Sequence, residues 1–288
     1  MKTRMSAKFA SRLLLALLAS GFAASATGQS LSGADGLLND HWVISLGGFF
    51  LTTDTRANLN GQSSINPDID FDREFGKAAD SRRIRADALW RVTPEHHLRL
   101  MYFDNSTVRS KALESDLQWG DYTFILGATA EFRQKTQVLE LAYEYAFVRR
   151  PSYEVAASVG VHYMDTKLQL SGTATFTDSA GHTTTASATT KVSSLPAPLP
   201  VIGLRWGWVL HPDWYLDVQG QVFKVKVGEY DGRWSDLRAG VTWMFHRNIG
   251  LGLGYNRFTT TLDVEKNDFD GRLKTGYSGL QAYLTGTF

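Results

Sequence analysis

The feature that most restricts the possible folds of this chain is a run of alternating apolar and charged residues in its first third. The even positions hold Ile84, Ala86, Ala88, Trp90 and Val92, while the charged residues Arg83, Arg85, Asp87 and Arg91 fall on odd positions. Alternation with a period of two indicates a β-strand whose two faces meet different surroundings. One face requires an apolar environment and the other a polar one, which is the pattern of a strand in the wall of a transmembrane barrel.

The same alternation recurs along the rest of the chain from Trp42 onward. Each stretch is at least about as long as the roughly 9–11 residues of a tilted membrane strand. We therefore predict an all-β fold, an up-and-down antiparallel transmembrane β-barrel of about ten strands, with eight and twelve as alternatives. The expected strands lie near 42–53, 82–92, 97–106, 130–148, 153–171, 198–210, 214–227, 235–245, 249–264 and 272–288.

The connections between these strands fall into two classes. Four are tight turns, at 93–96, 149–152, 211–213 and 246–248, and the longest of the others are loops at about 54–81, 107–129 and 172–197. Short periplasmic turns and long outer loops are typical of outer-membrane barrels. We expect the long loops to face outward and to be mobile.

The first residues have the layout of a secretory signal. Four basic residues precede an apolar run from Leu13 to Ala19, and a small-residue cleavage site ends at Ala26. The predicted organisation is a signal peptide over 1–26, a short periplasmic lead-in over 27–41 and a barrel over 42–288. The chain has no cysteine, so disulfides cannot stabilise it, and its net charge of +1 does not suggest a nucleic-acid partner.

Aromatic residues gather beside the tight turns. Tryptophan and tyrosine rings favour the boundary between lipid and water, so these residues predict the turn-side girdle of the barrel. The expected girdle comprises Trp42, Trp90, Tyr145, Phe147, Tyr153, Trp208, Trp214 and Trp243. Core packing is the alternative interpretation, but it gives no reason for aromatics to cluster at turns.

The final strand completes the resemblance to a known group. Leu280, Ala282, Leu284 and the terminal Phe288 alternate along it, with Gly286 where a bulky residue is usual. With the features above, residues 42–288 resemble the small proteobacterial outer-membrane β-barrel proteins, a broad OmpA-like, OmpW-like and porin-like group. The resemblance implies a Gram-negative outer membrane, contact with lipid and lipopolysaccharide, and recognition of the last strand by the barrel-assembly machinery. It leaves the oligomeric state open.

Carrying the alternation through each strand predicts the side chains of the barrel interior. Six cations should face six anions there: Arg83, Arg85, Arg91, Arg99, Arg205 and Arg238 with Asp87, Glu140, Glu144, Glu154, Asp217 and Asp236. Ten strands enclose little more space than the eight-stranded barrels that side chains just fill. We therefore expect a network of ion pairs with water in its gaps.

Two places break the alternation. After Val222 the apolar residues change face at Phe223, and a similar change follows Tyr163. A β-bulge, or the end of the hydrocarbon layer, would explain both changes.

Three functions remain open from the sequence. The first is a barrel without catalysis that has a structural or surface-binding role, the second is a narrow porin-like channel for small solutes, and the third is an enzyme acting on lipid A or peptides. Among the histidines only His162 is expected to point inward, and Ser158 is about 13 Å away along the strand, too far for a catalytic pair. We therefore expect no catalytic residue, no cofactor and no metal site.

Overall fold

The computed structural model describes residues 33–60, 69–70, 75, 80–114, 116–119, 122–177, 182–193, 197–227, 230–266 and 269–288. Ten long strands follow one another around a closed antiparallel barrel. They are β1 (Trp42–Asn60), β3 (Asp80–Arg91), β4 (His96–Ala112), β7 (Thr129–Arg150), β8 (Tyr153–Thr177), β10 (Ala197–His211), β11 (Trp214–Val227), β12 (Tyr230–His246), β13 (Ile249–Lys266) and β14 (Phe269–Thr287). The predicted fold class and strand count are confirmed.

The barrel closes where its last strand meets its first. β14 and β1 pair without interruption from Val43 opposite Thr287 to Asn60 opposite Asp270. The backbone of Phe288 extends this seam, since its N–H donates to the oxygen of Trp42 and its oxygen accepts from the N–H of Trp42. Each of the ten long strands thereby pairs with its two neighbours around the ring at the end of the barrel that holds this seam, as a membrane-spanning sheet requires.

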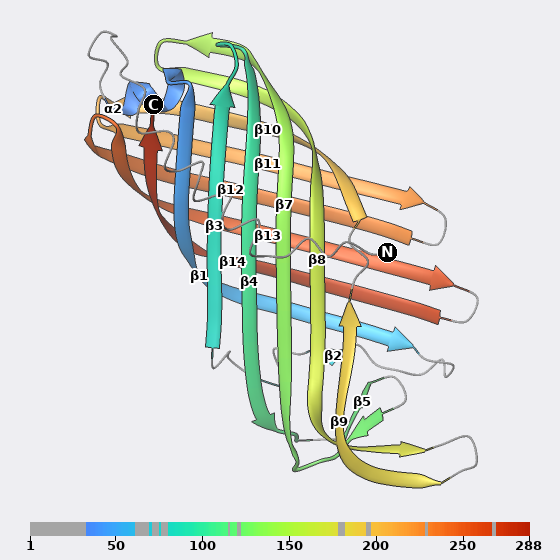
Figure 1. Cartoon of the computed structure of the whole chain (residues 1–288). Helices are drawn as coiled ribbons and strands as arrows, with labels where there is room; N and C mark the ends of the chain where they lie inside the picture. The colour runs from blue at the N-terminus through green and yellow to red at the C-terminus, as the bar shows by residue number, and fades with distance from the viewer. Residues whose placement is uncertain are drawn as a thin grey trace, which may run out of the picture.

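The four predicted tight turns all lie at one end of the barrel, called here the turn end, where the C-terminus also lies (Figure 1). The opposite end, the loop end, differs from expectation because the strands continue into the predicted loops. β8 extends to Thr177, and three short strands add to the wall: β5 (Leu117–Trp119), β6 (Tyr122–Phe124) and β9 (Thr183–Ser193). The segment 172–197 is therefore largely a strand pair, and β2 (Ile69–Asp70) similarly pairs with β1.

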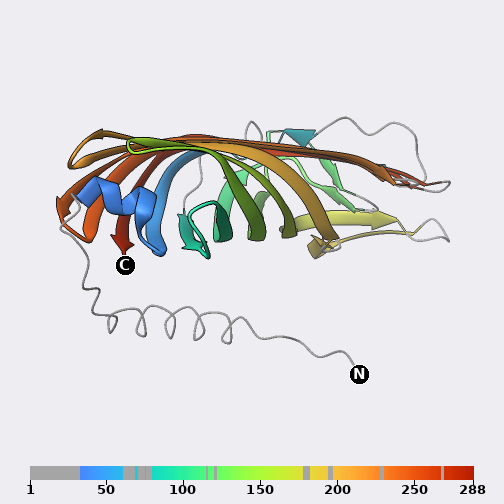
Figure 2. The same ribbon diagram turned by 90° about the horizontal axis from the view of Figure 1, so that it is seen from above.

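The wall divides into two sheets toward the loop end. β1 pairs with β3 only from Trp42 to Gly48, and pairing between β10 and β11 stops at Ile202 opposite Val222. Beyond those levels the sheet that contains β11 to β14 and β1 diverges from the sheet that contains β3, β4, β7 and β8 (Figures 1 and 2). The second sheet carries β9 and the β5–β6 hairpin.

A short helix closes the turn end. The expected lead-in 27–41 contains α2 (Gly33–Asn39), which lies across the barrel mouth (Figure 2). Ala34 and Leu38 pack against Tyr215 and Met244 of the wall, so the helix forms a plug. No helix in the described residues is long and apolar enough to cross a membrane. The predicted signal peptide lies outside the described residues.

Candidate functional site inside the barrel

All twelve charged residues predicted for the interior lie on the inward face of their strands. Glu140 and Glu144 have no measurable exposure, and Arg85, Arg91, Arg99, Glu154 and Arg205 are 5% exposed or less. The strand alternation produces this arrangement because side chains at i and i+2 share one face. The charges form a layer across the barrel, called here the charged layer.

Glu144 is shared by two arginines of the layer. It accepts a hydrogen bond from Nε of Arg99 at 2.6 Å and another from Nε of Arg205 at 2.9 Å. Arg205 also donates to Glu154 at 2.6 Å, and Arg91 lies 3.5 Å from the same carboxylate. These shared ion pairs join five strands, β3, β4, β7, β8 and β10.

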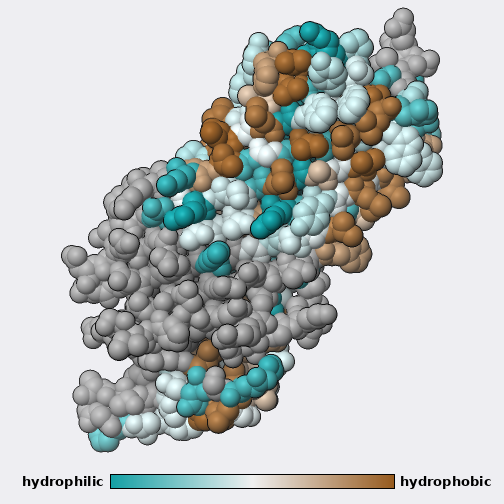
Figure 3. Space-filling model, turned by 180° about the vertical axis from the view of Figure 1, so that it is seen from behind, coloured by the Kyte–Doolittle hydropathy of each residue, from teal (hydrophilic) through white to brown (hydrophobic). Residues whose placement is uncertain are grey.

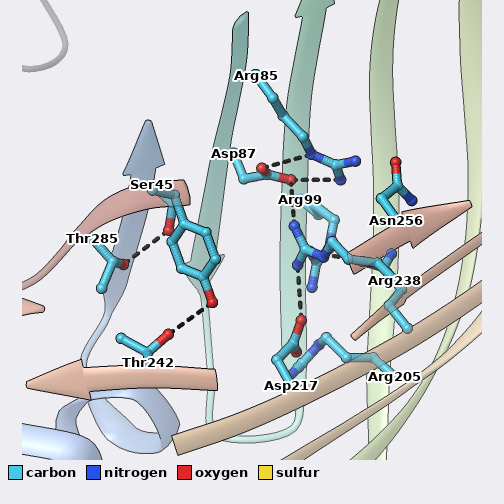
Figure 4. Close-up of polar contacts among 12 residues, drawn as sticks. Ser45, Arg85, Asp87, Arg99, Arg205, Asp217, Arg238, Thr242, Asn256 and Thr285 are labelled. Atoms are coloured by element: carbon cyan, nitrogen blue, oxygen red, sulfur yellow. Dashed lines mark hydrogen bonds and ion pairs between the residues drawn. The ribbon is translucent and has the colours of Figure 1, made fainter. Parts of the chain in front are cut away.

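A second group of pairs surrounds Arg238 on β12 (Figure 4). Arg238 donates to Asp217 at 2.8 Å and lies 3.4 Å from Asp87. Asp87 in turn accepts two hydrogen bonds from the fork of Arg85, both at 2.9 Å. Asp236 contacts Arg85 at 3.9 Å and accepts from the amide of Asn256. Planar guanidinium groups suit this shared pairing because each presents several donors.

Glu140 is bound differently from the other acids. His162 lies 2.9 Å from one of its oxygens, and the amide of Gln221 donates to the other at 2.6 Å. Arg83, the sixth predicted cation, lies toward the loop end and donates to Asn105 at 3.3 Å. The interior thus includes a histidine–carboxylate contact in addition to the predicted arginine–carboxylate pairs.

His97 corrects the expectation that His162 is the one inward histidine. Its side chain is fully buried, its Nε2 lies 2.9 Å from the oxygen of Pro94, and its Nδ1 lies 3.9 Å from Glu144. The tight turn before β4 misled the sequence argument, since the strand begins at His96 and its alternation already places His97 inside.

An apolar layer crosses the barrel on the loop-end side of the charges. Tyr277 joins its two halves, with its ring 5.0 Å from Phe103 and 4.9 Å from Phe258. Trp234 packs edge-on against His162, so this aromatic layer rests directly on the charged one. Its members are Phe49, Met101, Phe103, Val138, Met164, Leu199, Val201, Phe223, Trp234, Phe258 and Tyr277.

The aromatic layer explains the two breaks in alternation. Phe223 points inward into this layer, and the register between β11 and β12 is continuous from Trp214 to Val227. Met164 likewise points inward, and β8 runs in unbroken register with β7 from Ala156 to Ser171; the one register shift of this pair lies near the turn, between Ala146 and Val148. The predicted bulge is wrong, because the interior itself becomes apolar at this level.

Between the plug and the charged layer lies a small polar cavity of about 70 Å³. Asp87, Asp217 and Arg238 line it from one side, and Leu37 of α2 closes it toward the turn end. Ser45 and Thr285 share a hydrogen bond of 2.8 Å at its margin (Figure 4). A cavity of this size with charged and hydroxyl side chains in its lining has room for a few water molecules.

Glycines on β12 and β13 make room for a tyrosine at this cavity. A Cβ added at Gly252 would lie 2.1 Å from ring atoms of Tyr283, and one at Gly240 would lie 2.8 Å from its hydroxyl. Thr242 holds that hydroxyl by a hydrogen bond of 2.9 Å. The backbone glycines thus form a flat floor on which the Tyr283 ring lies.

The outer surface of the barrel is apolar and carries the predicted aromatic residues. Trp90, Tyr145, Phe147, Trp208, Trp214 and Trp243 are all more than a third exposed on it, and Trp42 and Tyr153 share their outward face. Trp42 stacks on Trp90 at 5.4 Å and Trp214 on Trp243 at 6.3 Å. Figure 3 shows apolar and aromatic side chains gathered over this end of the molecule.

The last strand contributes to the same outer surface. Leu280 and Leu284 are more than half exposed, and Ala282 lies between them on the outward face, opposite Gly48. A closed antiparallel barrel with an apolar exterior, interfacial aromatics and a charged interior defines a transmembrane β-barrel of the bacterial outer-membrane class.

Comparisons with known proteins find only remote structural similarity. No protein-family model matches the sequence, and no curated protein matches it significantly. The outer membrane protease OmpT from Escherichia coli is 11% identical, with 86% of this chain and 96% of that chain covered and a TM-score of 0.45. The toluene transporter TodX from Pseudomonas putida is 9% identical (92% and 95% covered, TM-score 0.33), and the attachment invasion locus protein Ail of Yersinia pestis is 8% identical (84% and 99%, TM-score 0.27). None of them assigns an activity to this chain.

The described residues contain no group of three or more histidine, aspartate or glutamate side chains arranged to hold a metal ion. Several polar members of the interior went unpredicted, including Gln219, Gln221 and Asn256, although each lies on an inward position of its strand. Extending the alternation argument from charged residues to amides would have found them. The sequence signal for the plug helix α2 was weaker, because its only large apolar residues are Leu37 and Leu38.

Proposed function

We propose that this protein is a sealed outer-membrane barrel without catalysis, which serves the envelope structurally and binds at its loop end. The observation that supports the proposal most directly is the succession of three barriers across the interior. The α2 plug, the charged layer and the aromatic layer follow one another along the barrel axis. Together they occupy the route that a solute would take.

The absence of catalysis remains part of the proposal. His162 and Glu140 form the pair that most resembles a base with its orienting acid, but Trp234 covers the histidine. Ser158 lies opposite Glu144 and Gly203 in the sheet, away from His162. A nucleophile in reach of the base is what such a pair would need.

Solute leakage from vesicles tests the sealed barrel. Proteoliposomes that contain the full chain should retain an entrapped small sugar as well as protein-free vesicles do. A variant that lacks residues 33–39 serves as a comparison, since it removes the first barrier and leaves the other two. Release of the sugar by the unaltered protein would favour the narrow channel, and release of acyl chains from added lipid A would favour an enzyme.

A narrow channel is the second candidate, and the polar cavity is the observation that favours it. The cavity already brings water-sized space against Asp87, Arg99 and Arg238. Displacement of α2 would connect this space to the turn end. The aromatic layer would still have to open for a solute to pass.

A further inference from the structure

Among the described strands, none covers the second edge of β9. It occupies the wall position that β10 holds nearer the turn end, because β8 pairs first with β10 and then with β9. Within the described part of the chain, β8 is the one strand that pairs with β9. The backbone groups along the second edge of β9 are therefore available to another strand.

The central seven residues of this edge lack the features that usually protect edge strands. From Thr184 to Thr190 the sequence is Thr-Thr-Ala-Ser-Ala-Thr-Thr, without charge, proline or glycine. The register with β8 continues through all eleven residues without a bulge, and residues 184–187 and 189 are exposed. Charges, prolines and bulges are the common means of preventing edge-to-edge pairing, so their absence from Thr184–Thr190 leaves this part of β9 open to strand addition.

The sequence of the edge is a palindrome centred on Ser187. When two copies of β9 pair antiparallel about that residue, Ser187 faces its own equivalent, Ala186 faces Ala188, and Thr185 faces Thr189. Thr184 then meets Thr190, and Lys191 meets Thr183 instead of another lysine. Threonine pairs stabilise neighbouring strands and directly opposed like charges destabilise them, so the register that matches every residue also avoids charge repulsion.

The geometry of a barrel wall fixes how two such molecules would be oriented. An antiparallel strand pair is related by a two-fold axis perpendicular to the sheet. In a barrel wall that direction is radial, and it lies in the plane of the membrane. Rotation about such an axis inverts the barrel, so the two molecules point in opposite directions with their loop ends facing each other.

From this arrangement we infer that β9 joins two copies of this protein across facing membranes by antiparallel strand pairing centred on Ser187. The inference rests on the proposed surface-binding role of the loop end and names its partner, a second copy of the same chain. The interface is isologous, so each molecule contributes the same strand.

Cysteine substitutions test both the register and the orientation, because the chain has no cysteine of its own. One population of vesicles carries Thr185→Cys and another carries Thr189→Cys, with the loop end of the full chain facing outward. Directly opposed residues of an antiparallel pair lie about 4.5–5.5 Å apart, within the Cα separation of a disulfide. We expect mild oxidation to produce dimers when the populations are mixed, and none in either population alone.

A charge exchange at the centre provides a second measurement that does not depend on disulfide chemistry. Vesicles with Ser187→Lys alone, or Ser187→Glu alone, should stay dispersed in light scattering, whereas a mixture of the two should cluster as the unaltered protein does. Thr173→Lys is the matched control, because Thr173 pairs with Ser187 from the covered side of β9 and its charge lies one strand farther from the partner. This control should still cluster.

Dispersed vesicles with the unaltered chain, or cross-linking of Thr185→Cys on its own, would overturn the inference. Dimers confined to molecules of one vesicle would contradict the facing-membrane geometry. The same vesicles report on the proposed function through their retention of sugar. Tight vesicles that fail to cluster would refute the strand pairing alone, and leaking vesicles would refute the sealed barrel.

Discussion

Replacement of Glu144 by glutamine removes the central anion of the charged layer while it preserves the shape of the side chain. Glu144 has no exposure and is held by Arg99 at 2.6 Å and Arg205 at 2.9 Å. Loss of one partner from a buried ion pair costs about 3–5 kcal/mol, because the other charge stays buried without compensation. Arg205 keeps Glu154 and Arg99 keeps Gln219 at 3.2 Å, so the expected cost lies near the lower limit, at about 3 kcal/mol.

Glu131 on the same strand supplies a matched control. It pairs with Arg133 at 2.5 Å, but both side chains are substantially exposed. Exposed pairs contribute about 0.2–1 kcal/mol, so Glu131→Gln should lower the free energy of unfolding by less than about 1 kcal/mol. Equilibrium urea unfolding in vesicles, followed by the fluorescence of the eight tryptophans, measures both variants. Equal destabilisation of the two variants, or a loss below about 1 kcal/mol for Glu144→Gln, would refute the claim that buried ion pairs hold this interior together.

Two further substitutions examine the glycine floor and the plug. Gly252→Ala should destabilise the barrel by about 1–3 kcal/mol in the same urea assay, because its Cβ would meet the Tyr283 ring at 2.1 Å. Gly220→Ala meets nothing closer than 3.9 Å and should be neutral or stabilising by up to about 1 kcal/mol, so equal losses would contradict the role of the floor. Leu38→Ala should weaken the packing of α2 against the wall by about 2 kcal/mol or more. Hydrogen exchange should then show amide exchange in α2 that is at least about 20-fold faster, while exchange in the strands stays unchanged. Unchanged exchange would show that the packing of α2 does not hold it in place.

The alternation of side chains accounts for what the sequence predicted well. A period of two assigns each residue of a strand to one face, so Arg85 and Trp90 could be placed inside and outside without knowledge of their neighbours. The ten strands and the closed barrel followed from the same rule. The lengths of the strands did not, because pairing beyond the membrane depends on partners such as β9 that carry no membrane signal.

The contents of the interior were harder to predict because they depend on contacts between distant strands. Phe223 and Met164 appeared as breaks in the pattern, and only the position of Tyr277 between Phe103 and Phe258 shows that they belong to one apolar layer. The contact of His162 with Glu140 likewise joins side chains whose levels along the barrel the alternation does not give. Alternation predicts which face of its strand a residue occupies, but it does not predict the position of that residue along the barrel axis relative to residues of other strands.

Single-channel recording in a planar bilayer tests the central claim, that three layers close the barrel interior, most directly. The full chain, inserted and verified as folded, should show no conductance steps over a range of applied potentials, and removal of residues 33–39 alone should leave it silent because the charged and aromatic layers remain. Stable, uniform steps from the unaltered protein would contradict the account, since they would require a continuous path past Glu144 and Tyr277.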